Sequence, residues 1–169
     1  EDGPEIVIVM PEKTGGWLEQ HTMDVLRGRL VAGLRAADHH GRLRIYYVRL
    51  DKAPHCSLMV HAKVMVIDDT FLRVGSSNLS NRSMGLDSEC DLAIAASADD
   101  ERLCQAIGRF RNRLLAEHLD INIEDVAAGI AKTGSLIAAI EDLRQGSRTL
   151  EALSADVPVL ISKQSGVAE

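Results

Sequence analysis

The sequence has no long apolar run, no paired cysteines and no excess of basic residues. Its uncharged aliphatic stretches are far shorter than the roughly 20 residues that a helix needs to cross a bilayer, so no membrane-spanning helix is predicted. The three cysteines form no CxxC pair, which argues against a disulfide framework and a zinc site and favours a reducing compartment. A formal net charge of -6 disfavours general binding to nucleic acid.

The start of the chain lacks the marks of a secreted protein. It opens with Glu1 rather than methionine, and it has no basic segment followed by an apolar one. We therefore expect a part of a longer protein, located in the cytoplasm, with any membrane association made through the parent protein. With 169 residues, of which 46% are hydrophobic and 26% charged, the chain is long enough for one globular domain and short for two.

Alternating strand-like and helix-like stretches predict an α/β domain. Residues 6–10 form a short aliphatic run between two prolines, which is typical of a buried strand. Residues 17–37 carry leucines at helical intervals, and residues 43–50 predict a second strand. The order strand, helix, strand is the βαβ pattern of a parallel pair.

The middle of the chain predicts a hairpin followed by a polar loop. Residues 59–67 and 71–74 predict two strands joined by a tight turn. Residues 75–88 are rich in Ser, Asn, Arg and Gly and predict a loop over the hairpin, and residues 90–96 predict another buried strand.

The C-terminal third predicts helices. Ser97 and Asp100 have the spacing of a capping box, and apolar residues then recur at helical intervals. We expect one domain over residues 1–146, with a helical extension from about residue 99, and a linker or tail over residues 147–169.

One polar motif within the predicted hairpin is the most specific feature of the sequence. It has the form His-x-Lys-x4-Asp-x6-Gly-Ser-x-Asn. If each fixed position is filled about one time in twenty by chance, such a match arises on the order of once in tens of millions of starting positions. The fixed positions are His61, Lys63, Asp68, Gly75, Ser76 and Asn78.

These residue types suit the cleavage of a phosphodiester. Such a reaction needs a nucleophile, a proton donor and positive charge near the non-bridging oxygens. His61 can supply one of the first two, and a second imidazole must supply the other. Lys63 follows two positions along the same predicted strand, so its ammonium lies on the same face and can pair with the phosphate. Ser76 and Asn78 can bond the remaining oxygens.

Asp68 and Gly75 allow more than one interpretation. Asp68 has the opposite strand parity from His61 and Lys63, so we expect it to support the site rather than react; without the motif it would be an ordinary turn carboxylate. Gly75 either lets the backbone approach a phosphate or turns the chain sharply, and a plain turn glycine fits the local sequence equally well.

The motif resembles the HKD signature of the phospholipase D superfamily, whose members cleave or exchange phosphodiester bonds without a metal or other cofactor. Residues 78–94, NLSNRSMGLDSECDLAI, resemble the segment after the second such motif in two-motif phospholipase D and cardiolipin synthase-type enzymes. The resemblance implies that Glu89 bonds a catalytic histidine and fixes its tautomer; without it, Glu89 would be an exposed loop acid. Arg82 could contact phosphate or brace the loop against Asp87 or Glu89.

The resemblance covers roughly Pro4 to the helices after Ser97. It implies an α/β fold with a mixed sheet flanked by helices, with extra C-terminal helices. It also implies the C-terminal half of a bilobal enzyme that hydrolyses phospholipids or transfers phosphatidyl groups through a phosphohistidine, with His61 as proton donor. Because only one motif is present, the expected partner is an N-terminal half of the parent chain or a second copy in a homodimer.

Two other functions stay open. One is a homodimeric single-motif phosphodiesterase or nuclease, which the acidic balance disfavours. The other is a catalytically silent module that binds phosphate-bearing partners. His55, Cys56 and His61 could in principle form a metal cluster, but their spacing matches no zinc pattern, so no metal is predicted. The arginines between residues 27 and 49 predict solvated faces, with contact to lipid headgroups at the membrane surface as the alternative.

Overall fold

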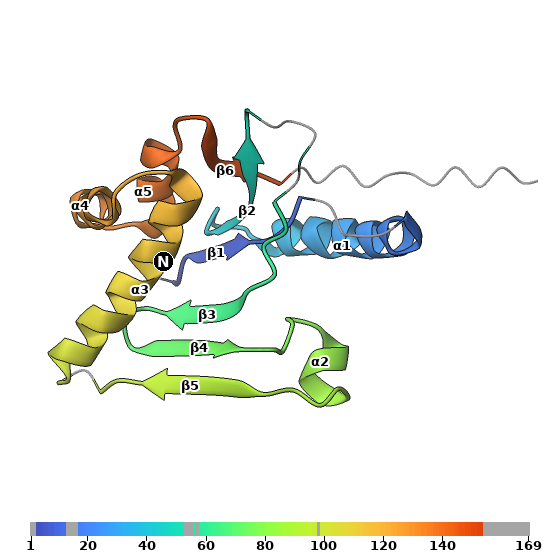
Figure 1. Ribbon diagram of the computed structural model, residues 1–169, viewed down its shortest axis with the longest axis horizontal. Coiled ribbons are helices and arrows are strands. Elements are labelled where there is room, and N and C mark those ends of the chain that lie inside the picture. Colours follow the sequence, from blue (N-terminus) through green and yellow to red (C-terminus); the bar gives the residue numbers. More distant parts are fainter. Residues whose placement is uncertain (1–2, 13–16, 53–55, 57, 98, 154–169) are drawn as a thin grey trace, which may run out of the picture.

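The computed structural model describes residues 3–12, 17–52, 56, 58–97 and 99–153, and Figure 1 shows its elements. The structure is mixed α/β, which confirms the predicted fold class. Within this part of the chain the strands form two three-stranded sheets. The elements are β1 (Ile6–Val9), α1 (Trp17–Ala37), β2 (Leu43–Leu50), β3 (Lys63–Ile67), β4 (Phe71–Gly75), α2 (Asn81–Gly85), β5 (Asp91–Ala95), α3 (Glu101–Leu119), α4 (Ile123–Thr133), α5 (Leu136–Leu143) and β6 (Arg148–Ala152).

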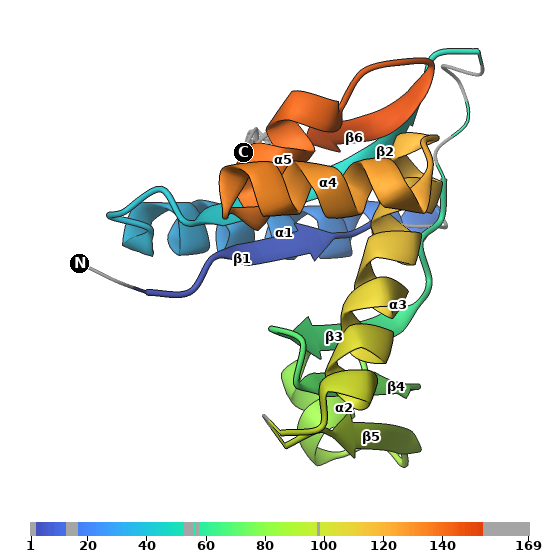
Figure 2. The ribbon, with the colours of Figure 1, turned by 90° about the vertical axis from the view of Figure 1, so that its left-hand side faces the viewer.

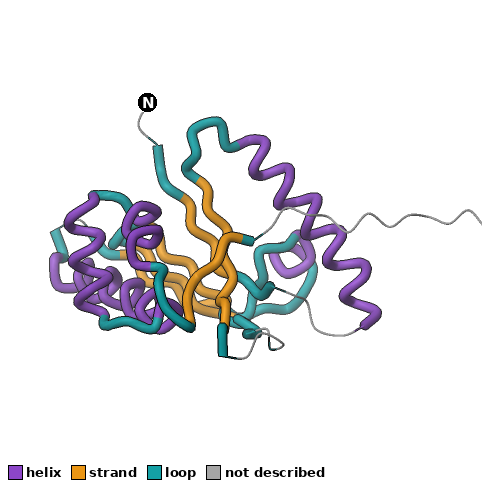
Figure 3. Tube along the Cα trace, turned by 90° about the horizontal axis from the view of Figure 1, so that it is seen from above, coloured by secondary structure: helices purple, strands orange, loops and turns teal. Residues whose placement is uncertain are grey.

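The first sheet contains β1, β2 and β6. β1 and β2 run parallel with α1 between them in sequence, which confirms the predicted βαβ unit. β6 pairs with the other edge of β2 in the antiparallel direction. Seen from above in Figure 3, α1 lies on one side of the strands and the C-terminal helices lie on the other. The first sheet is therefore the middle of three layers.

Alternate residues of β2 enter two separate cores. Tyr46 and Val48 pack with Leu150 of β6 and with apolar residues of α3, α4 and α5. Ile45 packs on the opposite face with Val31 of α1. Fully burying side chains of this size contributes about 1.5–3 kcal/mol each. Because β2 carries apolar side chains on both faces, it is covered by α1 on one side and by the C-terminal helices on the other.

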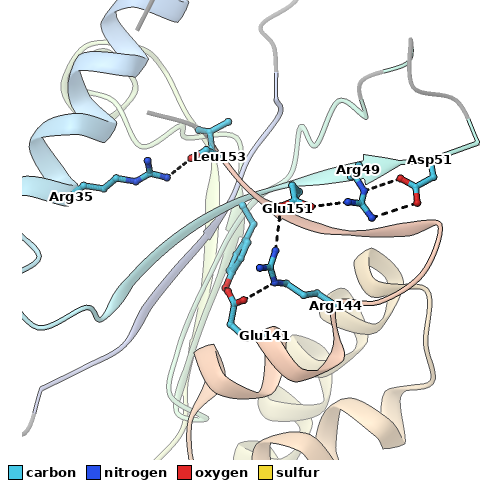
Figure 4. A network of polar contacts seen from close by, with 8 residues as sticks. Arg35, Arg49, Asp51, Glu141, Arg144, Glu151 and Leu153 are labelled. Atoms are coloured by element: carbon cyan, nitrogen blue, oxygen red, sulfur yellow. Dashed lines mark hydrogen bonds and ion pairs between the residues drawn. The ribbon is translucent and has the colours of Figure 1, made fainter. Parts of the chain in front are cut away.

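A chain of polar contacts ties the C-terminal elements to the first sheet (Figure 4). The buried Tyr46 hydroxyl donates to the Glu141 carboxylate of α5 at 2.6 Å. Arg144 pairs with Glu141 at 2.6 Å and with Glu151 of β6 at 3.4 Å. Glu151 in turn pairs with Arg49 of β2 at 2.9 Å. Burial and the bond to Glu141 raise the pKa of Tyr46 above its ordinary value.

The second sheet is the antiparallel set β3, β4 and β5. Lys63 stands opposite Gly75, and Gly75 stands opposite Asp91. Because directly opposed residues share a face, Lys63, Arg73 and Asp91 lie together on what we name the motif face. The other face, the aliphatic face, is formed by Val64, Val66, Leu72, Val74, Leu92 and Ile94.

Helix α3 runs from the first sheet to the second (Figure 2). Its Arg111 pairs with Asp69 in the β3–β4 turn at 2.5 Å. The helix begins one turn later than the predicted capping box implies, because Asp100 is the N-cap and accepts the Leu103 N–H at 3.0 Å. Ser97 lies before the cap and accepts the Asp100 N–H through its carbonyl at 3.0 Å.

Three other segments differ from the prediction. β3 begins at Lys63 rather than at residue 59, because its partner β4 ends at the opposed Gly75. All of β5, which is one of the two edge strands of the second sheet, is exposed rather than buried. Residues 148–152, predicted as part of a linker, form β6, in which Leu150 is fully buried. Residues 154–169 of that predicted tail lie outside the described residues.

Candidate functional site

The first residues of β3 and β5 and the last residue of β4 meet at one end of the second sheet. Lys63, Gly75 and Asp91 form the row of opposed residues there. His61 lies two residues before the start of β3 and is exposed, while Lys63 is half-buried. The Lys63 amine donates to the backbone carbonyl of His61, with Nζ and O 2.8 Å apart. The ammonium therefore lies beside the His61 backbone at an accessible end of the sheet.

The chain between β4 and β5 is closed at its base by hydrogen bonds. The Ser76 hydroxyl donates to the Glu89 carboxylate at 2.5 Å and accepts the Cys90 N–H at 2.9 Å. The Ser76 N–H donates to the Cys90 carbonyl at 3.1 Å. Ser77 donates to the Asp91 carboxylate through both its N–H and its hydroxyl. The serines that follow Gly75 thus hold both ends of this connection together.

Gly75 is needed because Asp91 occupies the space beside it. A Cβ atom at Gly75 would lie 1.8 Å from Asp91 Oδ1 and 2.7 Å from Asp91 Cα. The sequence left open a sharp turn or a close approach to phosphate. The structure instead places this glycine in a paired strand, where its missing side chain admits the Asp91 carboxylate.

Of the three described cations at this end of the sheet, two have carboxylate partners. Arg73 pairs with Asp91 at 2.8 Å, and Arg82 of α2 pairs with Asp87 at 2.9 Å. Chiefly because of the Arg73 hydrogen bond, the pKa of Asp91 falls from 3.8 to about 2. Lys63 forms no ion pair with any described residue. Its positive charge is therefore free to meet an added anion.

Asp68 lies away from the other motif residues. It follows the last residue of β3, whereas Lys63 is the first, and a strand of 5 residues is roughly 16 Å long. Asp68 adopts a left-handed conformation with φ of 49°, in the turn that joins β3 to β4. The structure therefore puts Asp68 in the position of a turn residue, remote from Lys63.

Glu89, Asn78 and Arg82 all lie in the connection between β4 and β5. The Glu89 carboxylate accepts the Ser76 hydroxyl and makes no hydrogen bond with the His61 ring among the described residues. Asn78 is exposed at the start of the connection. Of the alternatives for Arg82, the structure shows the brace against Asp87.

Sequence reasoning missed three residues that organise this end of the sheet, namely Arg73, Ser77 and Asp91. Arg73 is a single charge within the aliphatic strand β4, and Asp91 is a single charge at the start of the apolar strand β5. Isolated charges at positions of the same face indicate a cross-strand pair, but only once the register is known. Ser77 gives no local pattern that would distinguish it from its neighbours.

The described residues contain a cleft away from the candidate site, and they contain neither a metal-binding cluster nor a membrane-spanning helix. A cleft at the β3–β4 turn, between α3 and α4, is lined in part by Asp69, Arg111 and Asn112 and contains none of the predicted site residues. Among the described residues, no three His, Cys, Asp or Glu side chains are grouped to hold a metal. His55, named above for a metal cluster, lies outside those residues. No described helix combines the length and apolar character needed to span a bilayer.

Comparisons with known proteins agree with the motif. The sequence matches the family described as cardiolipin synthase, PLD-like domain, over residues 3–113. It is 35% identical over 78 residues to phospholipase D alpha 1 of Nicotiana tabacum, and 33% identical over 85 residues to phospholipase D alpha 1 of Zea mays. It is 30% identical over 82 residues to phospholipase D alpha 3 of Arabidopsis thaliana.

These alignments cover 43%, 47% and 44% of this chain, and 10% of each relative. The chain thus spans about a tenth of the length of these curated relatives. The family match, by contrast, extends over most of the chain and includes the whole motif from His61 to Asn78, as well as Glu89 and Asp91. The chain therefore belongs to the cardiolipin synthase, PLD-like domain family of the phospholipase D superfamily.

Proposed function

We propose that this chain is one half of a phospholipid phosphodiesterase or phosphatidyl transferase, with His61 and Lys63 as its reactive pair. The observation that carries the proposal is the meeting of His61, Lys63, Ser76 and Glu89 at one accessible end of the second sheet, with the Lys63 ammonium unpaired among described residues. A phosphodiester anion needs such a free cation beside an imidazole.

Glu89 is proposed as the carboxylate that orients the His61 ring. If the pairing of β3, β4 and β5 continued for two residues beyond its present end, His61 would stand opposite Ser77, and Ser77 opposite Glu89. A small serine between them leaves room for a carboxylate to reach an imidazole N–H across the row. Such a bond would fix the ring tautomer, as in hydrolytic triads.

The proposed reaction proceeds in two displacements at phosphorus. The unprotonated imidazole of one histidine attacks, the phosphorus–oxygen bond to the leaving alcohol breaks, and a second, protonated imidazole gives its proton to the departing oxygen. Water or an alcohol then gives a proton to that second imidazole and attacks phosphorus, and the bond between phosphorus and the first imidazole breaks. Lys63, Ser76 and Asn78 would hold the non-bridging oxygens, and Asp68 would act only by supporting the hairpin.

This scheme needs two imidazoles, and among the described residues the site on one chain offers His61 alone. We propose that the counterpart comes from an N-terminal half of a parent chain or from a second copy of this chain. In the first arrangement His61 is the proton donor and later the base. In the second, each His61 can take either role, and the activity per chain should rise with chain concentration, because two chains form one site.

A soluble chromogenic phosphodiester tests the proposal without requiring a membrane. The chain, alone or with an N-terminal half added, should hydrolyse it, and His61→Ala should abolish the activity. His39→Ala is the matched control, because His39 is also exposed but lies in the loop after α1. Equal activity of the two variants, or none under any condition, would leave the silent phosphate-binding module as the better account.

The nuclease alternative is separated by substrate choice. The net charge of -6 disfavours a nucleic-acid substrate, since binding DNA normally relies on a basic excess. We expect phosphatidylcholine vesicles to be cleaved faster than single- or double-stranded DNA. Faster cleavage of DNA would replace the lipid substrate with a nucleic acid.

A further inference from the structure

The connection between β4 and β5 carries large apolar side chains at its tip. Leu79, Met84 and Leu86 are 75%, 59% and 85% exposed, and no other described large hydrophobic residue is as exposed as Leu86. A single exposed leucine is ordinary, but three within eight residues of one connection form a patch. We name residues 79–86 the apolar tip.

The apolar tip is ordered from within and fixed to the candidate site at its base. Ser80 caps α2 by accepting the Ser83 N–H, and Ser83 is buried. At the base, the Ser76–Glu89 bond closes the connection at 2.5 Å. Met84 Sδ lies 4.0 Å from Arg73 on the motif face. The tip is therefore held over the same face that carries Lys63, and Figure 1 shows α2 beyond the end of β4.

We propose that the apolar tip inserts into the surface of a phospholipid bilayer through Leu79, Met84 and Leu86. This inference rests on the proposed function and names the surface on which that site would act. Leu79 follows Asn78, a proposed phosphate-binding residue, so the two Cα atoms are only about 3.8 Å apart. In a bilayer the lipid phosphates lie just above the acyl chains, and interfacial apolar side chains enter that boundary by roughly 5–10 Å.

The charges of the tip favour a zwitterionic lipid surface over a strongly anionic one. Arg82, the single cation of the tip, is already paired with Asp87 at 2.9 Å. No basic cluster that would gather anionic lipids accompanies it within residues 79–86. Apolar burial therefore supplies the attraction, and binding should depend weakly on salt.

Sedimentation with sucrose-loaded phosphatidylcholine vesicles tests the proposal with the whole chain. The double variant Leu79→Ser/Leu86→Ser should lower the vesicle partition coefficient by about tenfold for each leucine removed from the interface. Leu92→Ser is the matched control. Its side chain is also 75% exposed, but it lies on the aliphatic face of the second sheet and should leave partitioning unchanged.

Three results would overturn the assignment. Partitioning of the double variant equal to that of the unsubstituted chain would show that the tip does not insert. An equal loss in the Leu92→Ser variant would show that exposed leucines act without regard to position. If the double variant keeps its vesicle binding but loses a dimer seen by analytical ultracentrifugation, the tip covers a second copy of the chain instead.

The same samples separate this proposal from the proposed function. The double variant should still hydrolyse the soluble phosphodiester, because that substrate needs no bilayer. His61→Ala should lose the hydrolysis and keep the vesicle binding. If the unsubstituted chain hydrolyses nothing, the proposed function fails, while the vesicle partition still decides whether the tip inserts.

Discussion

A methyl group added at Gly75 would collide with Asp91 on the neighbouring strand. The new Cβ would lie 1.8 Å from Oδ1, 2.6 Å from Cγ and 2.7 Å from Cα of Asp91. The carboxylate can rotate away, but the Cα atom belongs to the backbone of β5. Gly75→Ala must therefore both displace the Asp91 side chain and push β4 and β5 apart.

The energetic effect follows from these two displacements. Inserting an extra methyl group into a filled space costs about 1–3 kcal/mol. The displaced carboxylate also leaves its partners Arg73 and Ser77, which can only add to the loss. We expect Gly75→Ala to lower the free energy of unfolding by at least about 2 kcal/mol. With a urea m-value of about 2 kcal/mol/M, the unfolding midpoint should fall by roughly 1 M.

Urea unfolding followed by circular dichroism measures this shift, and Gly33→Ala provides the matched control. No atom lies within 4 Å of a Cβ built at Gly33, which is inside α1. Alanine there should raise the free energy of unfolding by about 0.5–1 kcal/mol, because it favours the helix more than glycine does. The same substitution should therefore have opposite signs at the two positions.

A double-mutant cycle with Asp91→Ala tests whether the collision with Asp91 causes the destabilisation by Gly75→Ala. If the collision with the carboxylate matters, Gly75→Ala should cost less in the Asp91→Ala background, since Oδ1 and Cγ are gone. The contact with the Asp91 Cα should keep the residual cost above zero. Equal costs in both backgrounds, or a stabilising Gly75→Ala, would show that Asp91 does not occupy the space beside Gly75.

Three further predictions test other parts of the structure. Tyr46→Phe removes the buried hydrogen bond to Glu141 and should lower the free energy of urea unfolding by about 1.5–3 kcal/mol. Glu5→Gln replaces, by a neutral amide, the carboxylate that accepts backbone N–H groups at the start of α5. The free energy of unfolding should fall by about 1 kcal/mol in the same assay. Arg73 holds the pKa of Asp91 at about 2, below 3.8, so this stabilisation is complete above about pH 4 and is lost as the pH falls toward 2. The Asp91→Asn variant should lack that part of the acid decline in unfolding curves recorded from pH 6 to pH 2.

The parts of the fold that local pattern determines could be predicted from the sequence. The βαβ unit of β1, α1 and β2 followed from an aliphatic run, a helical repeat and a second run. The hairpin of β3 and β4 followed from two such runs around Asp68 and Asp69. In each case two successive strands along the chain pair with one another, so the local sequence pattern is enough to predict the unit.

Elements that depend on distant partners could not be predicted in this way. β6 is only 5 residues long, and it becomes a strand because β2 offers a free edge and because Glu151 meets Arg49 and Arg144. The exposure of β5 likewise depends on what the rest of the fold places against it, since its apolar composition alone suggests burial. In both segments tertiary context overrides local composition.

The candidate site shows the same division within a few residues. The motif named His61 and Lys63, but the geometry around them depends on Asp91, which lies outside the motif. Asp91 fills the space that Gly75 leaves, binds Ser77 and pairs with Arg73. Because Arg73 is neutralised in this way, Lys63 remains the cation without a described carboxylate partner at the site. A change at Asp91 should therefore disturb the site more than its distance from the motif in sequence suggests.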